Sequence, residues 1–180
     1  MVWDLSKQKT IFECRPFKVE ELTFSDREKP YYRLNAPEWC NVFPVTVDGR
    51  AILIRQYRQG VMRTVLETPG GVIDSSEKDP TMAAMRELEE ETGFTSQRVL
   101  PLAVINPNPA IMDNRTHFFV ALGCYPNPNR KHFPEGEEDE IRVELTALSE
   151  LDTMIRTGRI DHALSALCIM MGMKYVKVPS

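Results

Sequence analysis

The chain concentrates carboxylates in one short segment. Seven acidic residues stand within residues 71–94, and four of those seven fall within residues 87–91. On a helix, Glu87, Glu90 and Glu91 share one side, where like charges repel by about a few tenths of a kcal/mol per pair. Hard divalent cations such as Mg²⁺ and Mn²⁺ bind carboxylate oxygens and would turn this repulsion into attraction. The spacing favours a divalent metal site; the alternative is a solvated acidic face, which charge runs usually form.

A helix with well-marked ends is needed to present these glutamates. Asp79 is a suitable N-cap, Pro80 is tolerated in a first helical turn, and Gly93 suits a left-handed residue that ends a helix. These signals predict a helix over residues 80–92. Arg86 precedes the acidic residues and is expected to pair with one of them, which would hold the carboxylate array in place.

A glycine-containing loop stands before this helix. The segment LETPGG, residues 66–71, follows a strand-like run. Its glycines permit backbone carbonyls to turn toward a ligand that side chains would otherwise screen. A strand, a glycine loop and an acid-faced helix are therefore expected to form one site.

Composition limits the class of protein. The 180 residues are 42% hydrophobic and 27% charged, which suits one globular domain with a sizeable core. A net charge of -4 provides no basic field for nucleic acid. The charged N-terminus and the lack of a long apolar run indicate a cytoplasmic protein with no membrane partner. The four cysteines lack CxxC spacing and are expected to be buried free thiols in a reducing compartment.

Strand patterns dominate the rest of the chain. Strand-like composition occurs at residues 11–17, 40–47, 51–57, 99–105, 116–125 and 140–148. Asp48 and Gly49 predict a hairpin between the second and third of these segments. In the C-terminal region apolar residues recur at three and four positions, which indicates helix. The pattern predicts an α+β domain with a mixed, mostly antiparallel β-sheet.

The acidic segment resembles the signature of the Nudix hydrolases. That signature has a glycine, five residues, a glutamate, seven residues, and then Arg-Glu, an aliphatic residue, any residue, Glu-Glu, any residue, glycine and an aliphatic residue. Here Gly71 is followed after five residues by Glu77, and after eight more by RELEEETGF at residues 86–94. The final aliphatic position is aromatic, and one residue is extra. We expect that residue in the loop 75–79, because an insertion inside the helix would rotate the glutamates by about 100°.

The resemblance extends beyond this motif. ILIRQYRQGVMRTVLETPGG, residues 52–71, and GRIDHALSALCIMM, residues 158–171, are similar to the branch that hydrolyses ADP-ribose and nucleoside diphosphate sugars. It implies an α/β/α sandwich of the Nudix type, with a mixed sheet flanked by helices, over residues 40–180. It also implies an N-terminal antiparallel β-region, residues 1–39, that serves homodimerisation.

The resemblance assigns metal ligands to the acidic segment. It implies that Glu87 and Glu91 are the principal ligands of Mg²⁺ or Mn²⁺, with Glu90 a partial or second-metal ligand. The backbone carbonyl of Gly70 would complete the set. Glu77 is expected to support the motif rather than take part in the chemistry.

Several residues resemble substrate-binding positions of the branch. Arg58 resembles an arginine that contacts the substrate, and Arg55 is a weaker candidate whose alternative is a surface ion pair. Glu67 resembles a substrate-side glutamate, and could equally cap the loop by binding backbone amides. An adenine or guanine base would also need an aromatic platform, for which Trp39, Tyr31 and Phe17 are the candidates, although aromatic residues more often lie in a core.

A general base must take a proton from the attacking water, and the acidic loop EGEEDE, residues 135–140, stands where the branch carries its catalytic glutamate. Alternate strand residues share a face, so an inward-facing Ile141 favours Asp139 and then Glu137. A shift of one residue favours Glu138 or Glu140. A solvated acidic turn is the alternative for each.

Substrate choice depends on a loop that departs from the branch pattern. Pro109 aligns with the branch proline, but Ala110 replaces a glycine, and Asn114 stands where a ribose-binding glutamate is usual. An Asp-x-Lys pattern of some nucleoside-diphosphate-sugar hydrolases is absent, and His162 starts the segment in its place. We therefore expect hydrolysis of ADP-ribose first, and of GDP-mannose or similar sugars second. A nucleotide sensor without catalysis is a minor alternative.

Overall fold

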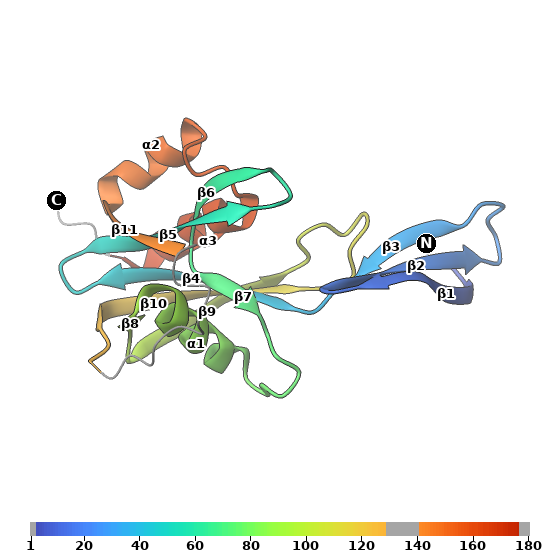
Figure 1. The fold of residues 1–180 in the computed structure, drawn as a ribbon, viewed down its shortest axis with the longest axis horizontal. Coiled ribbons are helices and arrows are strands. Elements are labelled where there is room, and N and C mark those ends of the chain that lie inside the picture. Colours follow the sequence, from blue (N-terminus) through green and yellow to red (C-terminus); the bar gives the residue numbers. More distant parts are fainter. Residues whose placement is uncertain (1–2, 129–140, 177–180) are drawn as a thin grey trace.

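The computed structural model describes residues 3–128 and 141–176. These residues form two β-sheets and three α-helices, with two short 3₁₀ helices near the C-terminal end. Figure 1 shows a body that contains the larger sheet and the helices, and an arm formed by the smaller sheet. Within the described residues, no helix is long and apolar enough to cross a membrane.

The arm is an antiparallel sheet of three strands in the order β1-β2-β3. Its strands are β1 (Leu5–Cys14), β2 (Phe17–Phe24) and β3 (Tyr31–Asn35). The prediction of one strand over residues 11–17 was wrong, because the chain turns at residues 15–16 and pairs back on itself. The N-terminal antiparallel β-region is therefore confirmed, with a hairpin where one strand was expected.

The body holds a mixed sheet of eight strands, whose central order is β11-β5-β4-β10-β8. Strands β4 and β10 are parallel, and the other pairs are antiparallel. Strand β6 pairs with β5, β7 with β4, and β9 with β10. The bounds are β4 (Trp39–Thr46), β5 (Arg50–Arg58), β6 (Arg63–Glu67), β7 (Gly70–Val72), β8 (Phe94–Thr95), β9 (Arg98–Ile105), β10 (Thr116–Pro126) and β11 (Ile141–Ala147).

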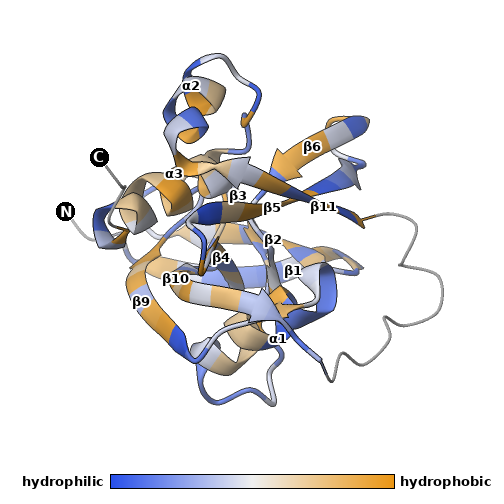
Figure 2. Ribbon diagram, turned by 90° about the vertical axis from the view of Figure 1, so that its left-hand side faces the viewer, coloured by the Kyte–Doolittle hydropathy of each residue, from blue (hydrophilic) through white to orange (hydrophobic). Residues whose placement is uncertain are grey.

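Helices cover both faces of this sheet. Helix α1 (Pro80–Thr92) lies on one face, and α2 (Leu151–Arg156) and α3 (Ala163–Gly172) lie on the other, as Figure 2 shows. The 3₁₀ helices η1 (Leu148–Glu150) and η2 (Met173–Tyr175) flank α2 and α3. These layers confirm the predicted α/β/α sandwich with a mixed sheet.

Alternation along the strands explains why two cores form. Neighbouring residues of a strand point to opposite faces of the sheet. Phe43 packs into the core beneath α2 and α3, whereas the adjacent Val42 packs into the core beneath α1. Leu53 and Ile52 divide in the same way. Central strands buried on both faces therefore have the continuous apolar composition seen in the sequence.

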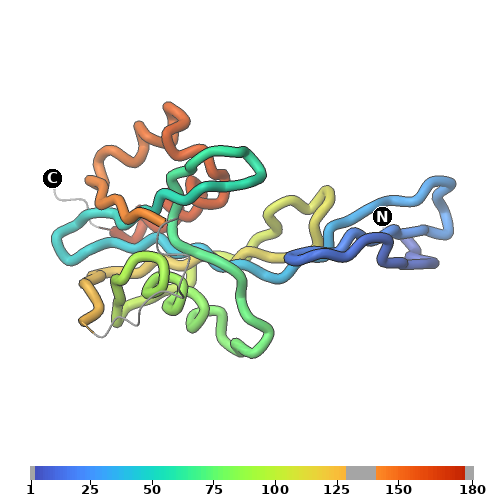
Figure 3. The backbone as a smooth tube through the Cα atoms, in the orientation of Figure 1, coloured from blue at the N-terminus to red at the C-terminus, as the bar shows by residue number. Residues whose placement is uncertain are grey.

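The loop over residues 106–114 connects the body to the arm. The Leu34 amide donates to the Ile111 carbonyl oxygen at 2.7 Å, and the Asp113 amide donates to the Leu34 carbonyl oxygen at 3.3 Å. Asn35 also donates to the Asp113 carboxylate at 3.1 Å. Figure 3 shows this loop beside the base of the arm. The loop that was expected to contact substrate is thus bonded to β3.

Candidate active site

Helix α1 begins and ends at its predicted capping residues. The Asp79 carboxylate accepts a 2.9 Å hydrogen bond from the Thr81 amide. Gly93 has a φ of 72°, and its amide donates to the Glu89 carbonyl oxygen at 2.9 Å. The helix is continuous between these caps. The glutamates therefore keep the helical phase that their spacing predicts.

Glu91 is a buried carboxylate directed at the glycine loop. Its side-chain Oε2 accepts a 2.8 Å hydrogen bond from the Gly70 amide, and the residue is 9% exposed. Burial raises the pKa of Glu91 to about 8; the Gly70 amide opposes this rise, and the negative charge of Glu87 adds to it. Desolvation disfavours the charged form when no cation compensates it. The carboxylate is therefore held in place without a full counter-charge.

Glu87 lies one helical turn earlier and faces the same loop. A Cβ atom on Gly71 would lie 2.5 Å from the Glu87 Oε1, so only glycine leaves room for this carboxylate. Burial raises the pKa of Glu87, although the Arg86 guanidinium opposes the rise, and the charge of Glu90 reinforces it. A buried carboxylate, Glu91, and a partly buried one, Glu87, both with raised pKa, thus meet the backbone of the glycine loop.

Arg86 holds the acidic motif together. Its Nε donates to Glu77 at 3.0 Å, and its Nη1 donates to Glu87 at 2.8 Å and to Glu90 at 2.9 Å. Its Nη2 donates to the Val72 carbonyl oxygen at 3.1 Å. The planar guanidinium can satisfy several acceptors at once because its donors have a fixed fork geometry. This arrangement agrees with the supporting role expected of Glu77.

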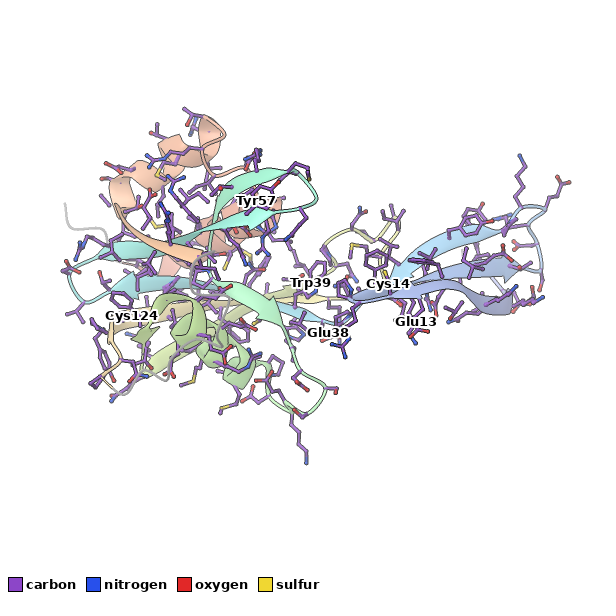
Figure 4. All side chains as sticks on the ribbon, viewed as in Figure 1. Glu13, Cys14, Glu38, Trp39, Tyr57 and Cys124 are labelled. Atoms are coloured by element: carbon purple, nitrogen blue, oxygen red, sulfur yellow. The ribbon has the colours of Figure 1, made fainter. Side chains whose placement is uncertain are left out.

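A cavity of about 550 Å³ opens beside the glycine loop. Strands β4 and β5 pair only at Val45 and Ala51, and beyond this point β7 pairs with β4 while β6 pairs with β5. The cavity is lined from both sides of this division, by β4 and β7 on one side and β5 and β6 on the other. Figure 4 shows Trp39, one of the lining residues, near the base of the arm.

Glu67 lies at the end of β6 in the wall of this cavity and is only 1% exposed. The Arg58 Nε donates to its Oε1 at 2.7 Å, and the Arg58 Nη2 donates to its Oε2 at 3.0 Å. The His162 Nδ1 lies 3.0 Å from the same Oε2. Burial acts to raise the pKa of Glu67, but the hydrogen bonds from His162 and Arg58 and the charge of Arg58 lower it to about 2. The carboxylate is therefore ionised and directly paired.

The structure brings only part of the predicted substrate set together. Trp39, Arg58, Glu67 and Gly70 all line the cavity. Glu67 binds two side chains, whereas the Gly70 amide of the loop, whose capping by Glu67 was the alternative, is bound by Glu91.

Three other predicted substrate residues do not line the cavity. Arg55 donates to Glu144 at 2.7 Å, which is the ion pair that was its alternative. Asn114 is 3% exposed and donates to the Pro37 carbonyl oxygen at 2.9 Å. Pro109 belongs to the loop that joins the arm. The base candidates Glu137, Glu138, Asp139 and Glu140 lie outside the described residues.

Sequence reasoning missed several polar residues of the cavity. Asn41, Arg63 and Asp161 line it, and Arg63 and Asp161 form an ion pair between β6 and the segment before α3. His162 was noted only as a departure from a sugar-hydrolase pattern. No local spacing connects these residues, since they come from distant parts of the chain. The only signal was the polar character of Asp161 and His162 at the start of an otherwise apolar helix.

Comparisons with known proteins agree with this site. Residues 40–164 match the model of the NUDIX domain. The chain is 29% identical over 171 residues to the ADP-ribose pyrophosphatase of Bacillus subtilis (strain 168), with 91% of each chain covered. It is 30% identical over 173 residues to the methanol dehydrogenase activator of Bacillus methanolicus, with 92% of each covered. A crystal structure of an ADP compounds hydrolase has a TM-score of 0.81 and 25% identity, and covers 97% of this chain and 94% of that one.

The chain belongs to the Nudix family. Its fold and its relatives define a hydrolase that acts on pyrophosphate bonds. Nudix hydrolases generally use divalent metal ions.

The acidic face of α1 fits a divalent ion in its chemistry. Glu87 and Glu91 supply hard oxygen donors, and burial leaves both without full charge compensation. Glu90 is half exposed and is directed to Arg86. Among residues 3–128 and 141–176, no three acidic, histidine or cysteine side chains converge as a metal cage.

Proposed function

We propose that this protein hydrolyses the pyrophosphate bond of ADP-ribose in the presence of Mg²⁺, with AMP and ribose 5-phosphate as products. One observation carries the proposal: the buried Glu91 and the partly buried Glu87 of α1 meet a glycine loop at the wall of a cavity of about 550 Å³. That volume lies in the range of about 300–1,000 Å³ that is usual for small-molecule sites. The Bacillus subtilis relative is named an ADP-ribose pyrophosphatase, which supports the choice of substrate.

Glu87 and Glu91 are the residues that would hold Mg²⁺ or Mn²⁺, together with the Gly70 carbonyl oxygen and with Glu90 as a further ligand. When bound, the ion neutralises charge on the pyrophosphate oxygens, which otherwise obstruct attack by water. The pairing of Arg86 with Glu87 and Glu90 supports this assignment, because it orients the carboxylates before the ion binds.

Arg58 is the residue that would bind a phosphate of the substrate. Its guanidinium is positively charged, lines the cavity and is anchored by the buried Glu67. A planar guanidinium suits the oxygens of a phosphate because it can donate two parallel hydrogen bonds.

One residue of the acidic loop would take the proton from the attacking water. Strand β11 begins at Ile141, which pairs with Gln56 two residues before Arg58. Ile141 thus starts the strand that pairs with β5, which carries Arg58. Asp139 is the first candidate and Glu137 the second, with Glu138 and Glu140 following if the register shifts by one.

The wall of the cavity offers both apolar and polar contacts to a nucleoside diphosphate sugar. Trp39, Val61 and Val72 supply apolar surface for a ring, and Trp39 is our candidate for stacking on the base. Pro109 and Asn114 carry no part of this proposal, because neither lines the cavity. GDP-mannose and related sugars are the second candidate substrates, since the same pyrophosphate and sugar chemistry would fit.

We also propose that the arm joins two copies of the chain. Ile11, Phe12 and Tyr32 are 47%, 56% and 52% exposed on its strands. Exposed apolar residues on a sheet with free edges favour association. Light scattering of the purified protein should give twice the 20.6 kDa of one chain. A single-chain mass for the wild type would exclude the dimer.

The proposed activity is tested by incubation of the purified protein with Mg²⁺ and a panel of substrates. The panel contains ADP-ribose, GDP-mannose, UDP-glucose, NADH, a dinucleoside polyphosphate and 8-oxo-dGTP. Release of AMP and ribose 5-phosphate from ADP-ribose alone is the expected result. Comparable cleavage of several sugars would identify a broader hydrolase. If neither Mg²⁺ nor Mn²⁺ supports cleavage of any substrate, that result would contradict the proposed activity and favour the alternative of a nucleotide sensor.

A further inference from the structure

A line of polar side chains runs beneath the wall of the cavity. The Asn41 Nδ2 of β4 donates to the Thr68 Oγ1 at 3.3 Å. The Ser165 Oγ of α3 accepts from the Thr68 amide at 3.1 Å and lies 3.2 Å from the Thr68 Oγ1. All three residues are buried, and Ser165 is 0% exposed. Buried polar groups need partners, so these contacts fix the start of α3 against the segment that follows β6.

The line continues through His162 to the carboxylate of Glu67. The His162 Nδ1 lies 3.0 Å from the Ser165 Oγ and 3.0 Å from the Glu67 Oε2. An ionised carboxylate can only accept hydrogen bonds, so Nδ1 carries a proton in this contact. Glu67 then binds the Nε and Nη2 of Arg58. The Glu67 carboxylate is thus held by His162, at the start of α3, and by Arg58 of β5.

The charge of Arg58 interacts with Glu91 of α1 as well as with Glu67. The hydrogen bond to Glu67 raises the pKa of Arg58, burial opposes the rise, and the negative charges of Glu67 and Glu91 add to it. The guanidinium therefore interacts electrostatically with both carboxylates, Glu67 and Glu91. Its direction depends on the orientation of Glu67, because Nε and Nη2 are both bound to that carboxylate.

We propose that His162, seated on Ser165, is a positioning residue for substrate binding, which acts by fixing Glu67 so that Arg58 presents its guanidinium to the pyrophosphate. This inference rests on the proposed function. Without the imidazole, Glu67 Oε2 keeps only the Arg58 Nη2 as a donor, so the carboxylate is held by Arg58 alone and can rotate with the guanidinium attached. The effect is expected on the binding of substrate more than on the chemical step, because Arg58 contacts a group that is charged before and during the reaction.

Two substitutions at the same position separate this role from a merely structural one. In His162→Asn, the side-chain amide nitrogen is as many bonds from Cβ as Nδ1 is, so the donor to Glu67 is retained. In His162→Gln, the nitrogen takes the place of Nε2 and the donor at the Nδ1 position is lost. Arg156→Gln serves as a control, because it removes an exposed ion pair with Asp152 on α2.

Steady-state hydrolysis of ADP-ribose with saturating Mg²⁺ supplies the first measurement. We expect the KM of His162→Gln to rise by about tenfold, with kcat within about threefold of the wild type. We expect the KM of His162→Asn and of Arg156→Gln to stay within about twofold of the wild type. Equal KM values for His162→Asn and His162→Gln would overturn the inference.

A second measurement does not depend on turnover. The Arg58 Nε–H should give a resolved resonance in NMR spectra of ¹⁵N-arginine-labelled protein, and Arg58→Lys assigns it by its loss. This resonance should move or disappear in His162→Gln and stay in place in His162→Asn. An unmoved resonance in His162→Gln would overturn the inference. If the wild type cleaves no substrate while the resonance behaves as expected, the proposed function fails and the positioning of Arg58 by His162 stands.

Discussion

Replacement of Glu91 by glutamine is expected to stabilise the protein and to abolish its activity. The ordinary pKa of a glutamate is 4.5, and burial raises the pKa of Glu91 to about 8. A carboxyl whose pKa is raised on folding binds more protons in the folded state, so stability falls as the pH rises from 4.5 toward 8. Each unit of pKa difference between the folded and the unfolded state corresponds to about 1.4 kcal/mol. Burial of Glu91 therefore lowers the stability of the metal-free protein at pH 7 by about 3 kcal/mol, relative to a pH at which the carboxyl is protonated in both states.

Glu91→Gln removes this cost because the amide is neutral and its oxygen can still accept from Gly70. Urea unfolding in EDTA should therefore give a free energy about 3 kcal/mol higher than that of the wild type at pH 7. The difference should shrink toward zero at pH 4.5, where the wild-type carboxyl is protonated in the folded state. In the presence of Mg²⁺, hydrolysis should fall by about 100-fold or more, because a metal ligand is lost.

Two outcomes would refute this reasoning separately. An equal or lower stability of Glu91→Gln at pH 7, in metal-free protein, would show that burial does not penalise the charge of Glu91. Near-normal activity of the same variant would refute its role as a metal ligand. Asp152→Asn is a suitable control, since Asp152 is an exposed carboxylate on α2 and its replacement should change neither quantity.

Three further predictions follow from the same geometry. Gly71→Ala should displace the Glu87 carboxylate and reduce kcat/KM by about tenfold or more, with the unfolding free energy changed by under about 1 kcal/mol; unchanged kinetics would contradict this. Since the pKa of Glu67 is lowered to about 2, its pairing stabilises the fold above pH 4.5, and this stabilisation is lost as the pH falls toward 2. The stability of Glu67→Gln should therefore depend less on pH between 4.5 and 2 than that of the wild type. Identical acid unfolding profiles of the two proteins would exclude this contribution. Arg86→Lys should cost about 1 kcal/mol in urea unfolding, because a single ammonium cannot satisfy the acceptors that the fork binds; a stability equal to that of the wild type would argue against the fork.

Much of the fold could be predicted because its signals are local. The alternation of faces along a strand and the capping of a helix depend on neighbours within a few residues. Asp79 and Gly93 marked the ends of α1, and the apolar composition of residues 40–47 and 51–57 marked strands buried on both faces. The boundary that failed, over residues 11–17, is a turn between the exposed β1 and the mostly half-buried β2, where no buried apolar face constrains the pattern.

The substrate side of the site was less predictable. Pro109 and Asn114 were placed by their position along the chain, but the loop that carries them is bonded to β3 and lies away from the cavity lining. Arg55 and Arg58 belong to one strand. Tertiary contacts direct Arg55 to Glu144 and Arg58 to Glu67. Composition alone cannot tell these two arginines apart.

The sequence by itself determined the acidic face of α1, because a helix places residues three and four apart on one side whatever surrounds it. Only the tertiary structure decided which groups meet that face and the cavity beside it. Arg58 lies nine residues from Glu67, and Thr68 lies 97 residues from Ser165, so their contacts depend on how β5, β6 and α3 pack. The number of residues between two such elements does not determine how far apart they lie in the folded protein. For this reason the sequence showed His162 only as a departure from the Asp-x-Lys pattern. Its proposed positioning role depends on the contact with Glu67 that the fold creates.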